Sequence, residues 1–131
     1  MLSKQKHIEY WTKTAEKDKE VIEYLLKGEK YVHALFFAHL YLEKLCKALW
    51  VKKNTENIPP KIHNLLKLVK DINLTRTEQD QLFLLKLNQY QIEGRYPDDI
   101  AKLYQMTNKN LTENSISETN KIAQCIQKHL Q

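Results

Sequence analysis

The fold is decided by residues 31–53, YVHALFFAHLYLEKLCKALWVKK. Apolar side chains in this stretch cover more than one face of a helix and leave a single polar stripe. A helix that is apolar on most sides lies at the centre of a bundle, where neighbouring helices or a second subunit cover it. Residues 31–53 therefore predict an all-helical fold built around one central helix.

The segments on either side of this stretch are amphipathic. Upstream, a three-four spacing of apolar residues predicts a helix of about 20 residues that ends at Gly28; its apolar positions are Ile8, Trp11, Ala15, Ile22 and Leu25. Downstream, Pro59 and Pro60 break the chain before a short helix over 65–72.

Three further helices are expected toward the C-terminus. Thr77 has the position of an N-cap for a helix that carries the apolar residues of 82–87, and a short helix follows over 98–106. The last helix is predicted from Ser115, where Ser115-x-x-Glu118 has the spacing of a capping box. Four of these helices are the principal ones. Their short connections predict an up-and-down antiparallel bundle of four to five helices, in one domain over residues 1–131.

Composition excludes several kinds of site. With only two glycines in 131 residues, the chain has no glycine-rich phosphate loop. Cys46 and Cys125 stand alone, and no metal-binding motif is present, so we expect small core cysteines, no metal and no cofactor. The longest apolar run is residues 34–38, from which we expect no membrane span, no signal peptide and a cytoplasmic location.

The formal net charge of +5 comes mainly from lysine, since Arg76 and Arg95 are the two arginines among 21 basic residues. The lysines are spread along the chain without a basic block, which favours solubility over nucleic-acid binding.

The polar stripe of the central helix carries ionisable residues four positions apart: His39, Glu43 and Lys47. Such groups amid apolar surface are costly unless they are paired. One interpretation is an internal network that includes Asp18 of the first helix and fixes the register of the helices. The other is a polar pocket or dimer groove that receives a ligand.

Three residues outside the central helix are candidate ligand contacts. His63 opens the third helix, where it either caps a backbone group or takes part in chemistry. Arg95, in a chain that otherwise uses lysine, suggests a need for the guanidinium fork, either for a carboxylate of Glu43 or Asp98 or for a phosphate. Tyr96 beside it either stacks on a base or closes the core.

Four motifs in order resemble those of the HEPN family (higher eukaryote and prokaryote nucleotide-binding domains). In chain order they are Ala15-x-x-Asp18, AHLYLEKLCKAL at 38–49, PPKIHNL at 59–65 and EGRYPD at 93–98. The resemblance implies a dimeric helical bundle that often acts with a small nucleotidyltransferase in a toxin–antitoxin-like pair. Many members of that family are metal-independent endoribonucleases with an Arg followed by His after four to six residues.

This chain departs from the ribonuclease motif, because neither Arg76 nor Arg95 is followed by a His at that spacing. The resemblance therefore implies a non-catalytic module that binds a nucleotide or RNA phosphate through Lys47, His63, Arg95 and Tyr96. Two alternatives stay open: an unorthodox ribonuclease that joins Arg95 to His39 or His63 by folding, and a structural homodimeric adaptor. A homodimer is also expected because the central helix has more apolar surface than its neighbours in one small bundle need to cover.

Overall fold

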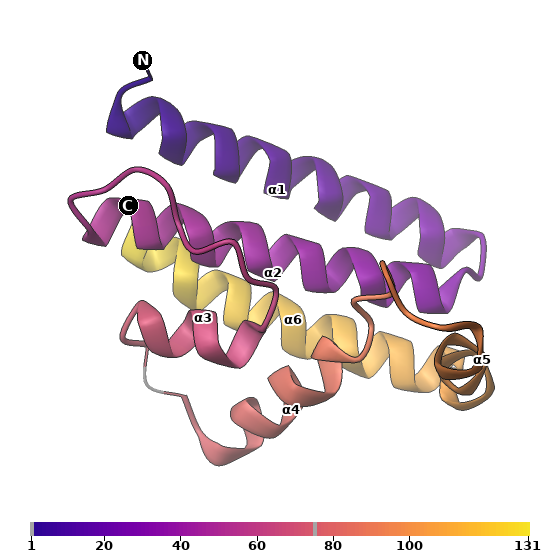
Figure 1. Cartoon of the computed structure of the whole chain (residues 1–131). Helices are drawn as coiled ribbons and strands as arrows, with labels where there is room; N and C mark the ends of the chain where they lie inside the picture. The colour runs from indigo at the N-terminus through magenta and orange to yellow at the C-terminus, as the bar shows by residue number, and fades with distance from the viewer. Residues whose placement is uncertain (1, 75) are drawn as a thin grey trace.

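The computed structural model, which describes residues 2–74 and 76–131, is a helical bundle without a strand among those residues (Figure 1). This confirms the all-helical fold. Its helices are α1 (Lys4–Lys27), α2 (Tyr31–Lys53), α3 (Leu65–Asp71), α4 (Glu78–Asn88), α5 (Pro97–Met106) and α6 (Lys109–Leu130). The long helices α1, α2 and α6 lie alongside one another, and the short helices α3 and α4 lie below α2 in the view of Figure 1.

Capping residues set most helix ends where the sequence predicts them. Gly28 follows α1 and donates its backbone N–H to the carbonyl of Tyr24 at 3.1 Å, which ends that helix. Thr77 caps α4, since its hydroxyl accepts from the backbone N–H of Asp80 at 3.1 Å.

The predicted start of the last helix is wrong by about two turns. The helix begins at Lys109, because the side chain of Asn108 accepts from the backbone N–H of Leu111 at 2.8 Å and acts as the cap. Ser115 lies inside α6. The polar sequence of 108–114 concealed this first part of the helix, whose apolar contribution to the core is small.

Helix α2 is the core of the protein, with 15 of its 23 residues buried. Helices α1 and α6 pack against it along their length, and α3 and α4 cover the remaining side. Trp50 is partly buried and packs against this core. Because the single chain already buries 15 of the 23 residues of α2, the apolar surface of this helix does not by itself require a second copy, and the homodimer stays a prediction.

Within the described residues, none of the helices combines the length and the apolar character that a membrane crossing demands.

Candidate functional site

A buried carboxylate, Glu43 on α2, joins three other ionisable residues. Its Oε2 lies 3.1 Å from the ammonium of Lys47, and its Oε1 lies 2.9 Å from Nδ1 of His63. Nδ1 of His39 is more distant, 3.7 Å from the same Oε1. The stripe that the sequence indicated is thus a compact cluster in which one carboxylate faces two histidines and a lysine.

Lys47 is 6% exposed, and its ammonium lies 5.5 Å from the ring centre of Trp11 on α1. A buried cation of this kind is stable because the Glu43 carboxylate and the aromatic face compensate its charge. The structure places Lys47 behind Glu43, inside the bundle.

Asp18, expected to belong to the same network, pairs with another residue. Its carboxylate lies 2.7 Å from the ammonium of Lys44, which is adjacent to Glu43 in sequence but projects in another direction around α2. This ion pair joins α1 to α2 separately from the Glu43 cluster.

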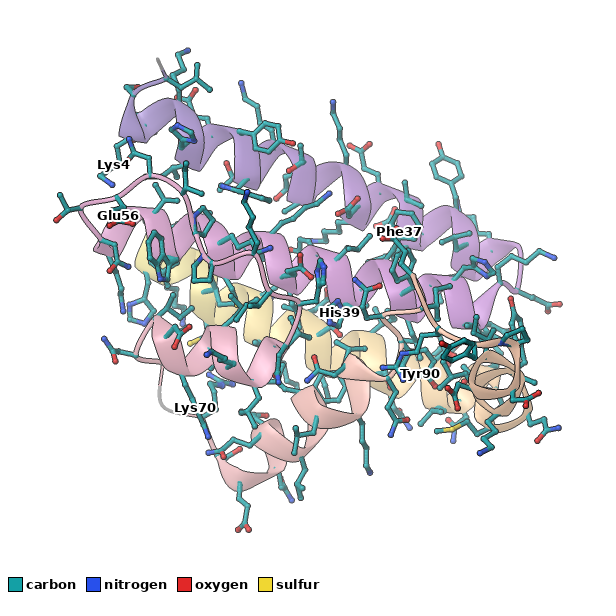
Figure 2. The ribbon with its side chains drawn as sticks, in the orientation of Figure 1. Lys4, Phe37, His39, Glu56, Lys70 and Tyr90 are labelled. Carbon is teal, nitrogen blue, oxygen red and sulfur yellow. The ribbon has the colours of Figure 1, made fainter. Side chains whose placement is uncertain are left out.

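His39 is fully buried on the side of α2 that faces α4 (Figure 2). Its Nε2 lies 3.3 Å from Oδ1 of Asn88, and the same Oδ1 accepts the backbone N–H of Leu65 at 2.9 Å. Because this second bond identifies Oδ1 as the acceptor, Nε2 of His39 is the donor. Burial lowers the pKa of His39 below its ordinary value, an effect that the nearby Glu43 carboxylate opposes. His39 is therefore a buried hydrogen-bond donor to Asn88.

His63 precedes α3 and has a side chain that is 59% exposed. One interpretation of the sequence made His63 the cap of α3. The cap is Asn64, whose side chain accepts the backbone N–H of Lys67 at 3.2 Å. The imidazole instead uses Nδ1 to contact Glu43. A carboxylate at Nδ1 fixes the orientation of the ring and leaves Nε2 available to a ligand.

Arg95 lies in the exposed turn between α4 and α5. It donates from Nε to the carbonyl of Gln91 at 3.0 Å and from Nη2 to the carbonyl of Asn88 at 3.2 Å. Neither Glu43 nor Asp98 is its partner among the hydrogen bonds of the described residues. Gly94 has φ of 77°, a left-handed conformation that bends the chain immediately before Arg95.

His63 and Arg95 line one shallow depression of about 270 Å³. Its other walls are polar side chains and the turn between α4 and α5; the full set is His63, Asn64, Asn88, Gln91, Glu93, Gly94 and Arg95. Folding thus brings together two residues that the sequence marked separately. Tyr96 is 78% exposed next to this depression in sequence, and Lys47 is buried away from it.

Asn64, Asn88 and Gln91 line this depression, but none of them was singled out as a site residue from the sequence. Asn64 carries a local signal, because Asn immediately before an apolar helix is a preferred N-cap. Asn88 carries none, since its side-chain hydrogen bonds are all with residues far from it in the chain.

The residues that the structure describes contain no group of three or more His, Cys, Asp and Glu side chains arranged to hold a metal ion.

A family model described as the HEPN domain matches residues 8–129, nearly the whole chain. No curated protein and no solved structure matches the chain.

Proposed function

This chain belongs to the HEPN domain family, and from that premise we propose that it binds a phosphate group of a nucleotide or of RNA without cleaving it. The observation that carries the proposal is the shared depression of Arg95 and His63. Two nitrogen-bearing side chains that face the same small volume suit an anion with several acceptor oxygens.

The hydrogen bonds of Arg95 leave part of its guanidinium group for a ligand. A guanidinium has five N–H donors, and the two bonds to the carbonyls of Asn88 and Gln91 use two of them. These bonds hold the side chain in place before a ligand arrives, which reduces the entropy lost on binding. Tyr96, exposed beside Arg95, offers a ring on which a base could stack.

Calorimetric titration with AMP, adenosine and a short single-stranded RNA tests this proposal. We expect AMP to bind and adenosine to bind more weakly, because the phosphate makes the charged contacts. Arg95→Lys should keep the fold and weaken AMP binding about tenfold, since lysine keeps the charge but loses the fork. Lys102→Ala, an exposed cation outside the depression, is the matched control. Equal affinity of wild type and Arg95→Lys would contradict the role of Arg95.

A second candidate function, metal-independent cleavage of RNA, is favoured by the contact between His63 and Glu43. A carboxylate at Nδ1 leaves Nε2 of the imidazole free to accept a proton, as a general base requires, and Arg95 is at hand for the phosphate. The family's Arg-then-His spacing is missing, however, so we expect no cleavage. Cleavage of labelled RNA by wild type that is lost in both Arg95→Ala and His63→Ala would establish this second function instead.

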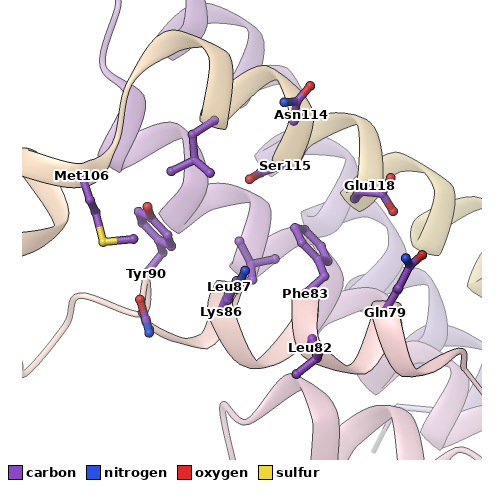
Figure 3. Close-up of a pocket in the computed structure, with 12 residues that line it drawn as sticks. Gln79, Leu82, Phe83, Lys86, Leu87, Tyr90, Met106, Asn114, Ser115 and Glu118 are labelled. Carbon is purple, nitrogen blue, oxygen red and sulfur yellow. The ribbon is translucent and has the colours of Figure 1, made fainter.

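The proposal includes a cytoplasmic homodimer that acts with a small nucleotidyltransferase in a toxin–antitoxin-like pair. In support of the homodimer, an apolar groove of about 340 Å³ lies between α4 and α6 (Figure 3). Phe83 and Leu87 line it, with Lys86 on the α4 side and Glu118 on the α6 side. Opposite charges on the two walls suit a two-fold contact in which Lys86 of each copy faces Glu118 of the other, the arrangement that we propose.

The nucleotidyltransferase partner is tested by co-expression. A nucleotidyltransferase reading frame adjacent to this one should yield a protein that copurifies with the tagged chain. A structural homodimeric adaptor, the remaining alternative, predicts a dimer that binds neither AMP nor RNA, so the titration above distinguishes it.

A further inference from the structure

One residue, Asn88 at the end of α4, touches every element around the depression. Its Oδ1 accepts the backbone N–H of Leu65 at 2.9 Å and lies 3.3 Å from Nε2 of His39. Its Nδ2 donates to Oδ1 of Asn64 at 3.1 Å, and its backbone carbonyl accepts from Arg95 at 3.2 Å. The side chain of Asn88 thus bonds α2 and the start of α3, while its main chain holds the guanidinium.

These bonds determine where α3 begins. The first N–H groups of a helix have no partner within the helix and need acceptors from outside. Asn64 supplies one for Lys67, and Asn88 supplies one for Leu65. His63 immediately precedes this anchored turn, so the position of its backbone depends on the two asparagines.

We infer that Asn88 is the positioning residue of the phosphate-binding depression, setting the place of His63 relative to Arg95; this inference rests on the proposed function. Oδ1 and one N–H of Nδ2 are already bonded within the protein, so most of the hydrogen-bonding capacity of the Asn88 side chain serves its neighbours rather than the ligand. The buried His39 completes the arrangement, because its Nε2 donates to Oδ1 from the core side.

Two substitutions separate positioning from general stability. Asn88→Ala removes the side-chain bonds to Leu65, Asn64 and His39 and leaves the carbonyl that Arg95 uses. Asn88→Asp keeps an acceptor for Leu65 and His39 but loses the donor to Asn64. The matched control is Asn110→Ala, an exposed asparagine of α6 that lines neither the depression nor the groove.

NMR spectra of the four proteins, recorded with and without AMP, provide the test. In Asn88→Ala we expect the Leu65 amide to lose its hydrogen-bonded shift and exchange faster, while the Arg95 Nε–H signal stays near its wild-type position. AMP affinity should fall about tenfold, the loss expected from one misplaced charge-assisted contact. In Asn88→Asp the Leu65 amide should regain its wild-type shift and exchange rate. The added carboxylate should raise the pKa of His39.

The outcomes distinguish this inference from the proposed function. An unchanged Leu65 amide in Asn88→Ala, or AMP affinity equal to wild type in a folded Asn88→Ala protein, overturns the positioning role. If wild type binds no AMP and no RNA, the proposed function fails. In that case, displaced signals of the Leu65 amide and the His63 ring in Asn88→Ala still support Asn88 as the residue that fixes the start of α3. If Asn88→Ala melts at a lower temperature than wild type but binds AMP with wild-type affinity at low temperature, Asn88 is a structural residue only.

Discussion

The pairing of Glu43 with Lys47 is a buried ion pair whose partners depend on each other. Glu43→Gln should lower the free energy of unfolding by about 3–5 kcal/mol, because it leaves the Lys47 ammonium buried without its counter-charge. Adding Lys47→Met should restore much of that loss, since the pair is then replaced by neutral groups of similar size. Urea unfolding of wild type, Glu43→Gln and the double variant measures both effects. A double variant no more stable than Glu43→Gln would show that Lys47 does not need the Glu43 carboxylate.

His39 makes the stability of the protein depend on pH. Because burial holds its pKa in the folded state below the ordinary 6.5, the folded protein resists a proton that the unfolded chain accepts. The contribution of His39 is therefore complete above pH 6.5 and is lost as the pH falls below that value. His39→Gln, which keeps a donor for Asn88, should flatten this part of the stability curve.

The control for this measurement is His129→Gln, since His129 is exposed near the end of α6. Denaturant unfolding at several pH values between about 5.5 and 7.5 gives, for each protein, the slope of the free energy of unfolding against pH. A slope in His39→Gln as steep as that of wild type would assign the effect to another group.

At the residue scale, the sequence indicates which ionisable side chains stand out better than it indicates which residues they contact. The four-residue spacing of His39, Glu43 and Lys47 puts all three on one side of α2, where His39 and Lys47 lie on either side of the Glu43 carboxylate. The sequence did not place Arg95 on the carbonyls at the end of α4, although that turn is local. It did not place Asp18 with Lys44 either, since this contact depends on how separate helices pack. Asn88 escaped notice for the same reason.

At the scale of elements, Lys4 joins the start of α1 to the end of α2. Its ammonium donates to the carbonyls of Val51, Asn54 and Glu56 and to the side chain of Asn57, over distances of 2.7–3.2 Å; Lys4 and Glu56 lie together in Figure 2. A cation here satisfies carbonyls at the C-terminal end of a helix, where the helix dipole is negative.

Lys4→Met should therefore lower the free energy of unfolding by about 1–3 kcal/mol and speed amide exchange in residues 54–60. Lys6→Met is the control, because Lys6 is mostly exposed and makes only a 3.7 Å contact with Glu9. Equal effects of the two substitutions would show that the carbonyls are satisfied by water once Lys4 is removed.

Helix boundaries illustrate what sequence patterns can predict. The end of α1 and the cap of α4 were predicted because Gly28 and Thr77 act within their own turns. The start of α6 was not, because its first turns carry few apolar residues and its Asn108 cap lies in a polar stretch.

At the scale of the whole molecule, the groove between α4 and α6 predicts how two copies associate. Lys86→Glu and Glu118→Lys should each weaken the dimer, because each places like charges together across the two-fold axis. The double variant should restore association, since it exchanges the two charges. Leu82→Asp, at an apolar residue of the groove that is 54% exposed, should give a monomer.

Sedimentation equilibrium over a concentration series measures these masses. Tyr24→Asp, an exposed aromatic on α1, is the control and should leave the dimer intact. A wild-type protein that stays monomeric at tens of micromolar rules out a second copy as the occupant of the groove.

The division between long and short helices has a consequence for how a ligand enters and leaves. The depression rests on α3 and α4, of 7 and 11 residues, whereas α1, α2 and α6 each have 22 or more. Helices as short as α3 and α4 do not persist in water without tertiary support, so they can fray while the long helices remain packed. The walls of the depression thus belong to short helices that can open locally, and ligand exchange needs neither a hinged lid nor global unfolding.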